Sequence, residues 1–135
     1  MLPLLEQAGV DVVLSGHSHM YERSMLLACH YGTSDTLTPS MRRGPELARG
    51  QRFIYQKPAR GAHNGALYAV LGASSKVDQG PLDHPAMVIS EARLGALVFH
   101  IQGQRLHGTF VRADGSVGDE FILRKTPGET TFGCD

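Results

Sequence analysis

A short run rich in β-branched residues near the N-terminus limits the folds open to this chain. Residues 10–15 (VDVVLS) predict a strand buried on both faces of a sheet. Residues 1–9 predict the end of a helix, because Pro3 suits a first helical turn and Gly9 suits the position after the last turn. A helix, a tight glycine turn and a buried strand form the pattern of an α/β layer, in which an earlier strand normally precedes the helix. The sequence starts within such a unit, which favours a fragment of a larger fold.

The remainder of the chain predicts mainly strands. Short strands are expected at residues 22–28, 66–71 and 87–91, and residues 31–60 lack any clear period and predict a long irregular stretch. Alternating apolar residues over 97–125, with two-residue turns at Gly103-Gln104 and Asp114-Gly115, predict an antiparallel meander. We therefore expect one domain over residues 1–125 and a loose polar tail over 126–135.

Composition and charge exclude several partner classes. The 135 residues include 13 Lys plus Arg and 13 Asp plus Glu, so the formal net charge is +0 and provides no broad attraction for nucleic acid or an anionic membrane. The longest apolar runs are too short for a transmembrane helix. Residues 1–7 have neither a basic segment nor a long apolar stretch, so no signal peptide is predicted there.

The two cysteines, Cys29 and Cys134, lie far apart and lack the C-x-x-C spacing of a zinc site. Two free thiols are the preferred interpretation. A disulfide that tethers the tail stays open as an alternative if the protein is exported to an oxidising compartment.

The segment after the first predicted strand carries the clearest chemical signal. Gly16-His17-Ser18-His19 directly follows residues 10–15, and ligand sites in open α/β sheets lie beyond the carboxyl ends of strands. Two histidines at i and i+2 in extended backbone point to the same side. Neutral imidazole is a good ligand for zinc and iron. Both histidines are therefore candidate metal ligands.

The same block continues as Tyr21-Glu22-Arg23, and G-H-x-H followed by Y-E-R resembles the last metal-binding block of calcineurin-like metallophosphoesterases, most closely the purple acid phosphatase type. The segments PLLEQAGVDVVLSGH and ALYAVLGASSKV and the ending over residues 95–125 are also similar to that family. The resemblance implies an α/β fold: the C-terminal part of a metallophosphoesterase β-sandwich flanked by helices, ending in an antiparallel meander.

The resemblance also implies a function. The family hydrolyses phosphate esters at a binuclear centre, of iron plus zinc, manganese or a second iron, where a metal-activated hydroxide attacks phosphorus. His17 matches the histidine that binds one metal and His19 the histidine that binds the other. Residues 21–23 match the segment after the ligands, to which we assign support of the loop, through an ion pair of Glu22 or Arg23, rather than chemistry. No catalytic residue is assigned in this chain.

Several family blocks have no match in the required order: D-x-H, G-D, G-N-H-E and a lone histidine. Gly118-Asp119 is a G-D pair, but it follows the histidine block. We therefore predict that the chain alone is inactive and needs the missing N-terminal half of the domain as its partner. The alternative is a non-catalytic β-rich module, or one subunit of a split enzyme, that binds a protein partner. Family members are often exported, which makes an extracellular location plausible by resemblance.

Other polar residues have simpler interpretations. His100 and His107 fall opposite each other across the predicted turn at 103–104 and could bind a metal, but exposure on the solvent face is preferred. The loop histidines His30, His63 and His84 are expected to be solvated or locally hydrogen-bonded. A loop arginine could meet a substrate phosphate, but a solubilising role is preferred for all four: Arg42, Arg43, Arg49 and Arg52. Ser74 and Ser75 lack the G-x-S-x-G context of a nucleophile. Residues 72–75 instead predict close approach of neighbouring backbone.

Overall fold

A computed structural model of the chain describes residues 1–44 and 53–134. In this part of the chain strands dominate, and the helical elements are the α-helix α1 (Leu2–Gln7) and two single 3₁₀ turns, η1 (Ser34–Thr36) and η2 (Pro39–Met41). Gly9 follows α1 with φ +74, as expected for a glycine just past a helix end. Flanking of the sheets by further helices stays a prediction.

The first sheet is mixed. Its strands lie in the order β1 (Val12–Ser15), β5 (Ala66–Leu71), β2 (Tyr21–Leu27) and β3 (Arg42–Arg43), and β6 (Met87–Glu91) pairs with β2. β1 and β5 are parallel, whereas β2 is antiparallel to β5, β3 and β6. The strands predicted at 66–71 and 87–91 are confirmed. The strand predicted at 22–28 begins and ends one residue earlier than expected.

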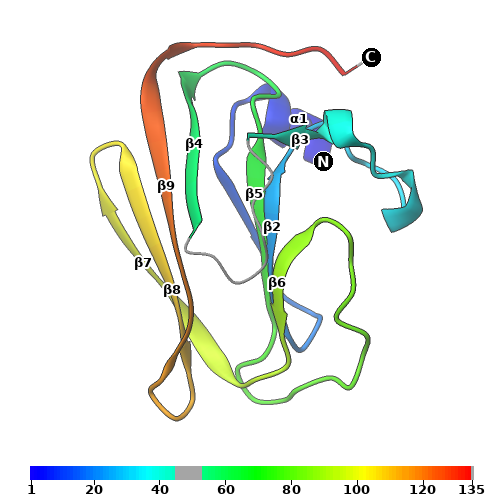
Figure 1. Ribbon diagram of the computed structural model, residues 1–135, viewed down its shortest axis with the longest axis vertical. Helices are drawn as coiled ribbons and strands as arrows, with labels where there is room; N and C mark the ends of the chain where they lie inside the picture. Colours follow the sequence, from blue (N-terminus) through cyan, green and yellow to red (C-terminus); the bar gives the residue numbers. More distant parts are fainter. Residues whose placement is uncertain (45–52, 135) are drawn as a thin grey trace.

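The second sheet is also mixed. It contains β4 (Phe53–Arg60), β9 (Val117–Glu129), β8 (Arg105–Arg112) and β7 (Gly95–Gln102), in that order. β7, β8 and β9 form the predicted antiparallel meander, and the turn at 103–104 places His100 opposite His107 as expected. β4 joins this sheet by parallel pairing with β9, so segments far apart in the sequence lie side by side, as in the pair Phe53↔Phe121 (Figure 1).

Three sequence predictions about irregular regions are wrong. The stretch 31–60 contains β3 and β4; Arg49 and Arg52 lie outside the described residues. The tail is not loose from residue 126, because β9 continues to Glu129, and beyond it the Thr130 and Phe132 N–H groups donate to carbonyls of Arg60 and Ala62. The prediction of free thiols is wrong as well: Cys29 and Cys134 form a disulfide.

The two sheets share a hydrophobic core. Its buried members come from both: Leu26, Leu67 and Val88 from the first sheet and Phe53, Tyr55, Phe121 and Leu123 from the second. Apolar burial of this kind is the main favourable term in folding. The expectation that residues 10–15 are buried on both faces is wrong, because β1 is the terminal strand of its sheet and Leu14 is 56% exposed.

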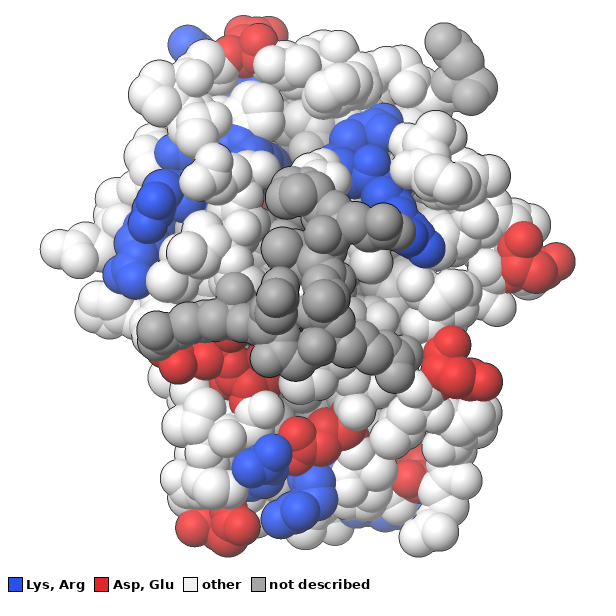
Figure 2. Space-filling view, viewed as in Figure 1, with Lys and Arg blue, Asp and Glu red and all other residues white. Residues whose placement is uncertain are grey.

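Basic and acidic side chains both occur over the face drawn in Figure 2. They are interspersed among uncharged residues, in keeping with the net charge of +0. No helix in the described part of the chain is long and apolar enough to cross a membrane.

Candidate functional site

The histidine segment lies at one edge of the first sheet, after the carboxyl end of β1. β1 and β5 run parallel with Ser15 beside Val70, so both strands end at this edge. The loop over residues 16–20 and the loop that begins at residue 72 therefore leave the sheet side by side. This is the placement expected for a ligand site in an α/β layer.

Gly72 brings the second loop into direct contact with the backbone between the two histidines. Its N–H donates to the Ser18 carbonyl oxygen at 3.1 Å. A Cβ at this position would lie 2.3 Å from that oxygen and 2.9 Å from the Ser18 carbonyl carbon, which is too close for any side chain. The predicted close approach of backbone is confirmed at Gly72, and it fixes the position of Ser18.

His17 is exposed and has φ +73, in the left-handed region. The assumption of an extended backbone is therefore wrong at this residue, and the i, i+2 argument for side chains on one side does not apply to it. The Ser18 N–H donates to the Gly16 carbonyl at 3.0 Å, so the loop turns sharply here. Metal binding by His17 stays a prediction that rests on the motif.

His19 is held by Asp78 through three contacts. The His19 N–H donates to Asp78 Oδ2 at 2.9 Å, the imidazole Nδ1 lies 3.0 Å from Asp78 Oδ1, and the Asp78 N–H donates to the His19 carbonyl at 3.0 Å. The hydrogen bond from the His19 backbone, followed by that from the ring, lowers the pKa of the Asp78 carboxyl below its usual value. An ionised carboxylate only accepts hydrogen bonds, so Nδ1 is the donor, and in the neutral tautomer with this donor the lone pair lies on Nε2.

This arrangement suits a metal ligand. Histidines that bind metals almost always donate their other ring N–H to a carboxylate, a carbonyl or water, which fixes the tautomer and the ring orientation. Asp78 meets that description for His19. Sequence reasoning missed Asp78, because a lone aspartate in an aperiodic loop gives no signal of its own.

The segment after the histidines is anchored in the interior by Asp119 of β9. Arg23 binds both oxygens of this carboxylate, Nε to Oδ2 at 2.7 Å and Nη2 to Oδ1 at 2.9 Å, and the Tyr21 hydroxyl donates to Oδ2 at 2.5 Å. The exposed fractions of the Arg23 and Asp119 side chains are 1% and 7%. The predicted ion pair of Arg23 in support of the loop is thus confirmed, with a partner that the motif did not identify.

Aromatic rings surround this ion pair. The Arg23 guanidinium carbon lies 4.6 Å from the ring centre of Phe53 and 4.9 Å from that of Phe121, and Nη1 donates to the Tyr55 hydroxyl. Tyr21 stacks on Phe110 with centroids 4.2 Å apart. Burial and the neighbouring carboxylate raise the pKa of Tyr21, and burial raises the pKa of Tyr55 to about 12. Both phenols are therefore neutral at ordinary pH and act as hydrogen-bond donors.

The pKa of Asp119 moves in the opposite direction. Burial alone would raise it, but the hydrogen bonds and positive charge of Arg23, together with the Tyr21 hydroxyl, lower it below the usual range.

Glu22 lies between Tyr21 and Arg23 in the sequence and accepts a hydrogen bond from Ser90 Oγ at 3.0 Å. Residues 21–23 therefore connect the histidine loop to both sheets.

The remaining candidates lie elsewhere. His107 Nε2 is 2.7 Å from Glu120 Oε1, and its cross-strand neighbour His100 is exposed, so this pair lies at the surface as preferred. Arg43 donates to the His63 and Ser40 carbonyls rather than facing the histidine loop. His84 Nδ1 accepts a hydrogen bond from the Ala86 N–H at 3.2 Å, a local contact as expected.

Comparison with known proteins gives a match among solved structures. No protein-family model and no curated protein matches this sequence. Among solved structures, the chain is similar to purple acid phosphatase PPD1 from the seeds of yellow lupin (Lupinus luteus), with a TM-score of 0.64 over 92% of this chain and 18% sequence identity. The match covers 19% of the lupin chain. The chain therefore shares the fold of one part of a purple acid phosphatase, in agreement with the resemblance of its G-H-S-H block.

Proposed function

We propose that the chain is the C-terminal part of a metal-dependent phosphoesterase, and that it supplies His17 and His19 to a binuclear centre completed by the missing N-terminal half. The observation that carries this proposal is the hydrogen bond between His19 Nδ1 and Asp78, which leaves Nε2 as the ring nitrogen that can bind a metal at the sheet edge. The likeness in fold to the lupin purple acid phosphatase supports the same assignment.

The residues present fit part of such a centre. His19 has the tautomer and the orienting carboxylate of a metal ligand, and His17 lies two residues away on the same loop. Two imidazoles are too few to hold two ions in a catalytic geometry, so further ligands are required from outside this chain. The metals would supply Lewis-acid activation of water and of the phosphate ester. The contribution of this chain is to position two ligands, through Gly72, Asp78 and the ion pair of Arg23.

The exposed position of strand β1 supports the proposal that this chain lacks a neighbouring segment. It is the terminal strand of its sheet, and Leu14 on it is 56% exposed. A terminal strand with an apolar side chain is a site at which another strand or chain pairs. The exposed edge is also compatible with the alternative function, a subunit that binds a protein partner. Metal binding and hydrolysis distinguish the phosphoesterase from this alternative.

The test has two arms. The purified chain with added iron, zinc and manganese is expected to show no multiple turnover of a phosphomonoester, because the other ligands are absent. A longer chain with D-x-H, G-D, G-N-H-E and the lone histidine upstream, in the same reading frame, is expected to hydrolyse it. In that protein, His17→Ala and His19→Ala should each remove metal and activity, and Asp78→Asn should weaken metal binding by about 10–100-fold.

Two results would contradict the proposal. One is turnover by the isolated chain at the rate of an ordinary phosphatase. The other is a longer chain that binds two metals equally well with or without His17 and His19.

A further inference from the structure

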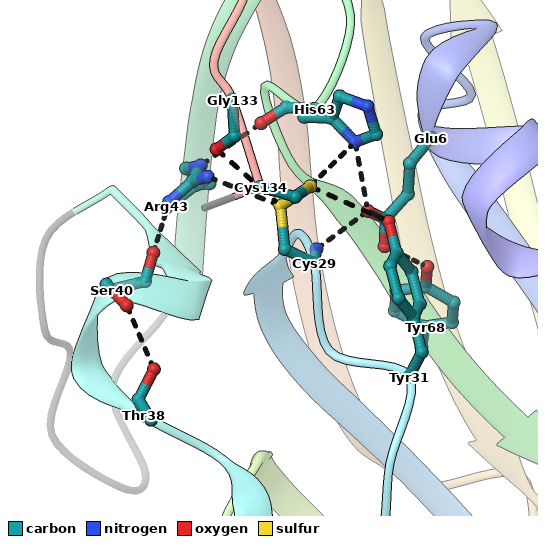
Figure 3. The surroundings of a disulfide bond; sticks show 10 residues. All are labelled: Glu6, Cys29, Tyr31, Thr38, Ser40, Arg43, His63, Tyr68, Gly133 and Cys134. Carbon is teal, nitrogen blue, oxygen red and sulfur yellow. Dashed lines mark hydrogen bonds and ion pairs between the residues drawn. A yellow bond between two sulfur atoms is a disulfide. The ribbon is translucent and has the colours of Figure 1, made fainter.

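Four side chains of the kinds that bind zinc meet at the C-terminal end of the described chain (Figure 3). They come from four separate segments: Glu6 from α1, Cys29 after β2, His63 between β4 and β5, and Cys134 from the tail. One donor atom of each lies within 4.8 Å of the other three. In the structure the two sulfurs are joined in the disulfide.

We propose that the reduced chain binds one zinc ion at Cys29, Cys134, His63 and Glu6, so that the tail is held by a metal when the disulfide is open. A dithiol opens the disulfide by donating two electrons and two protons, and is itself oxidised to a disulfide. Zinc binding then releases the two thiol protons and leaves two thiolates, an imidazole and a carboxylate around the ion. This site is independent of the proposed phosphoesterase function.

The distances already suit a tetrahedral site. With Zn–S of about 2.3 Å and Zn–N and Zn–O of about 2.0–2.2 Å, the ligand atoms lie about 3.3–3.8 Å from one another. His63 Nδ1 is 3.3 Å from Cys134 Sγ and 3.5 Å from Glu6 Oε2. All four donor atoms lie within 4.8 Å of one another, and the main change required is separation of the two sulfurs from bonding distance to about 3.8 Å. Cys134 is exposed on the tail and can make this movement.

The cluster is also organised around a buried negative charge. Glu6 is 3% exposed, and its carboxylate accepts hydrogen bonds from the Cys29 N–H, the Tyr31 hydroxyl and the Tyr68 hydroxyl at 2.7–2.8 Å. In the described part of the chain its ion-pair partner is His63. A buried carboxylate needs compensation by a positive charge, and a zinc ion at this position provides it.

Neighbouring groups favour thiolates. Arg43 Nη2 lies 3.9 Å from Cys29 Sγ, and the guanidinium stacks on Phe132 of the tail at 4.8 Å. Two thiolates and a carboxylate exceed the charge of Zn²⁺ by one, and Arg43 offsets the excess. The Glu6 carboxylate keeps Oε1 bonded to Tyr68, so it stays oriented when Oε2 turns to the metal.

The test compares one polypeptide in two redox states. His17 and His19 are both changed to Asn, which removes the other candidate ligands, and the chain is prepared oxidised or reduced with a dithiol that is then removed without air. Cobalt(II) is titrated into each sample. The reduced chain is expected to bind one equivalent, with thiolate-to-cobalt charge transfer in the near ultraviolet and strong tetrahedral d–d bands, and one equivalent of zinc should displace the cobalt. The oxidised chain should show neither signal.

The His63→Asn variant decides whether the fold builds the site. It is expected to weaken cobalt binding by at least about 10-fold, and Glu6→Gln should also weaken it, whereas the exposed His100→Asn should have no effect. Absence of the charge-transfer band in the reduced chain would overturn the proposal. The proposal would also be overturned if the reduced His63→Asn variant bound cobalt as tightly as the reduced parent chain. The two thiols would then be binding the metal without the other ligands that the fold supplies. This reading holds whether or not the reduced chain is folded before metal is added.

Discussion

Arg23 connects three parts of the molecule at the scale of a single side chain. It belongs to β2, which begins just after the histidine loop, and it binds Asp119 of β9 while its guanidinium lies against Phe53 of β4. The bidentate geometry and burial make this pair unlike a surface ion pair. Its removal would leave an uncompensated carboxylate in the core.

Arg23→Met is therefore expected to destabilise the chain by about 3–5 kcal/mol. The matched control is Arg93→Met, because Arg93 pairs with Asp114 at the surface, where both side chains are 57% exposed. That change should cost about 0–1 kcal/mol. Chemical denaturation of the two variants beside the parent chain measures the difference. Equal losses of stability would show that the buried pair contributes no more than a surface pair.

The lowered pKa of Asp119 predicts a dependence of stability on pH. Because the folded pKa lies below the unfolded value of about 3.9, the contribution of Asp119 is fully present above that value. It is lost as the pH falls through the folded pKa. The melting temperature of the parent chain should therefore fall on acidification more steeply than that of Asp119→Asn. Parallel curves for the two proteins between neutral pH and about pH 2 would contradict this prediction.

Part of the candidate site could be predicted from sequence at this scale. The motif over 16–23 identifies His17, His19 and the supporting role of Arg23 because residue types and spacing carry the signal. Asp78 and Asp119 could not be found in this way. Asp78 is 59 residues from His19 and Asp119 is 96 from Arg23, and only the folded chain brings them together.

The loops that follow β1 and β5 act as one unit at the scale of elements. Gly72 lies against Ser18, and Asp78 in the same loop holds His19, so the second loop fixes the first at two points. A displacement of either contact would change how the two imidazoles are presented.

Gly72→Ala is expected to destabilise the chain by about 1–3 kcal/mol, because the added Cβ would push against the Ser18 carbonyl. Gly80→Ala is the matched control in the same loop, since the nearest atom to its Cβ would be Met20 Cε at 3.6 Å, an ordinary contact. Thermal unfolding measures both effects, and ¹H–¹⁵N spectra should show shifts at residues 17–19 for Gly72→Ala alone. Similar spectra for the two variants would mean that the close contact does not position the loop.

Strand prediction succeeded for the meander and failed for β4. The meander β7–β8–β9 has alternating residues and short turns, so its strands are visible in the sequence. β4 was missed because buried Lys57 interrupts its apolar alternation and Pro58 favours an irregular segment. Proline is tolerated because β4 is a terminal strand of its sheet. Its parallel pairing with β9 also explains why β9 continues through Pro127 and Gly128.

The whole molecule has a shared core but an open side. The core joins both sheets, which favours cooperative unfolding of the described chain. The open side is β1, where the first sheet ends and Leu14 is exposed. If the chain is part of a larger domain, this side should associate when the neighbour is missing.

We expect the isolated chain to self-associate, and Leu14→Lys to reduce that association by placing a charge on the edge strand. Val98→Lys is the control, because Val98 is 55% exposed on β7, the terminal strand of the other sheet. Sedimentation velocity over a range of concentrations measures the association of each variant. A chain that stays monomeric at high concentration would contradict the fragment hypothesis, and equal effects of the two substitutions would show that β1 is not the contact surface.

The disulfide has a mechanical consequence for the whole chain. Because Cys29 and Cys134 are covalently joined, a force applied between Met1 and Cys134 passes along residues 1–29 and across the bridge. The strands β3 to β9 lie inside the closed ring, so their backbone cannot be extended by this force while the bridge is intact. Stretching the oxidised chain between these two residues would release only about 100 Å of backbone, against more than about 400 Å once the bridge is open. Under tension, the redox state of two sulfur atoms therefore decides whether the strands of the second sheet can be extended or are held within the closed ring.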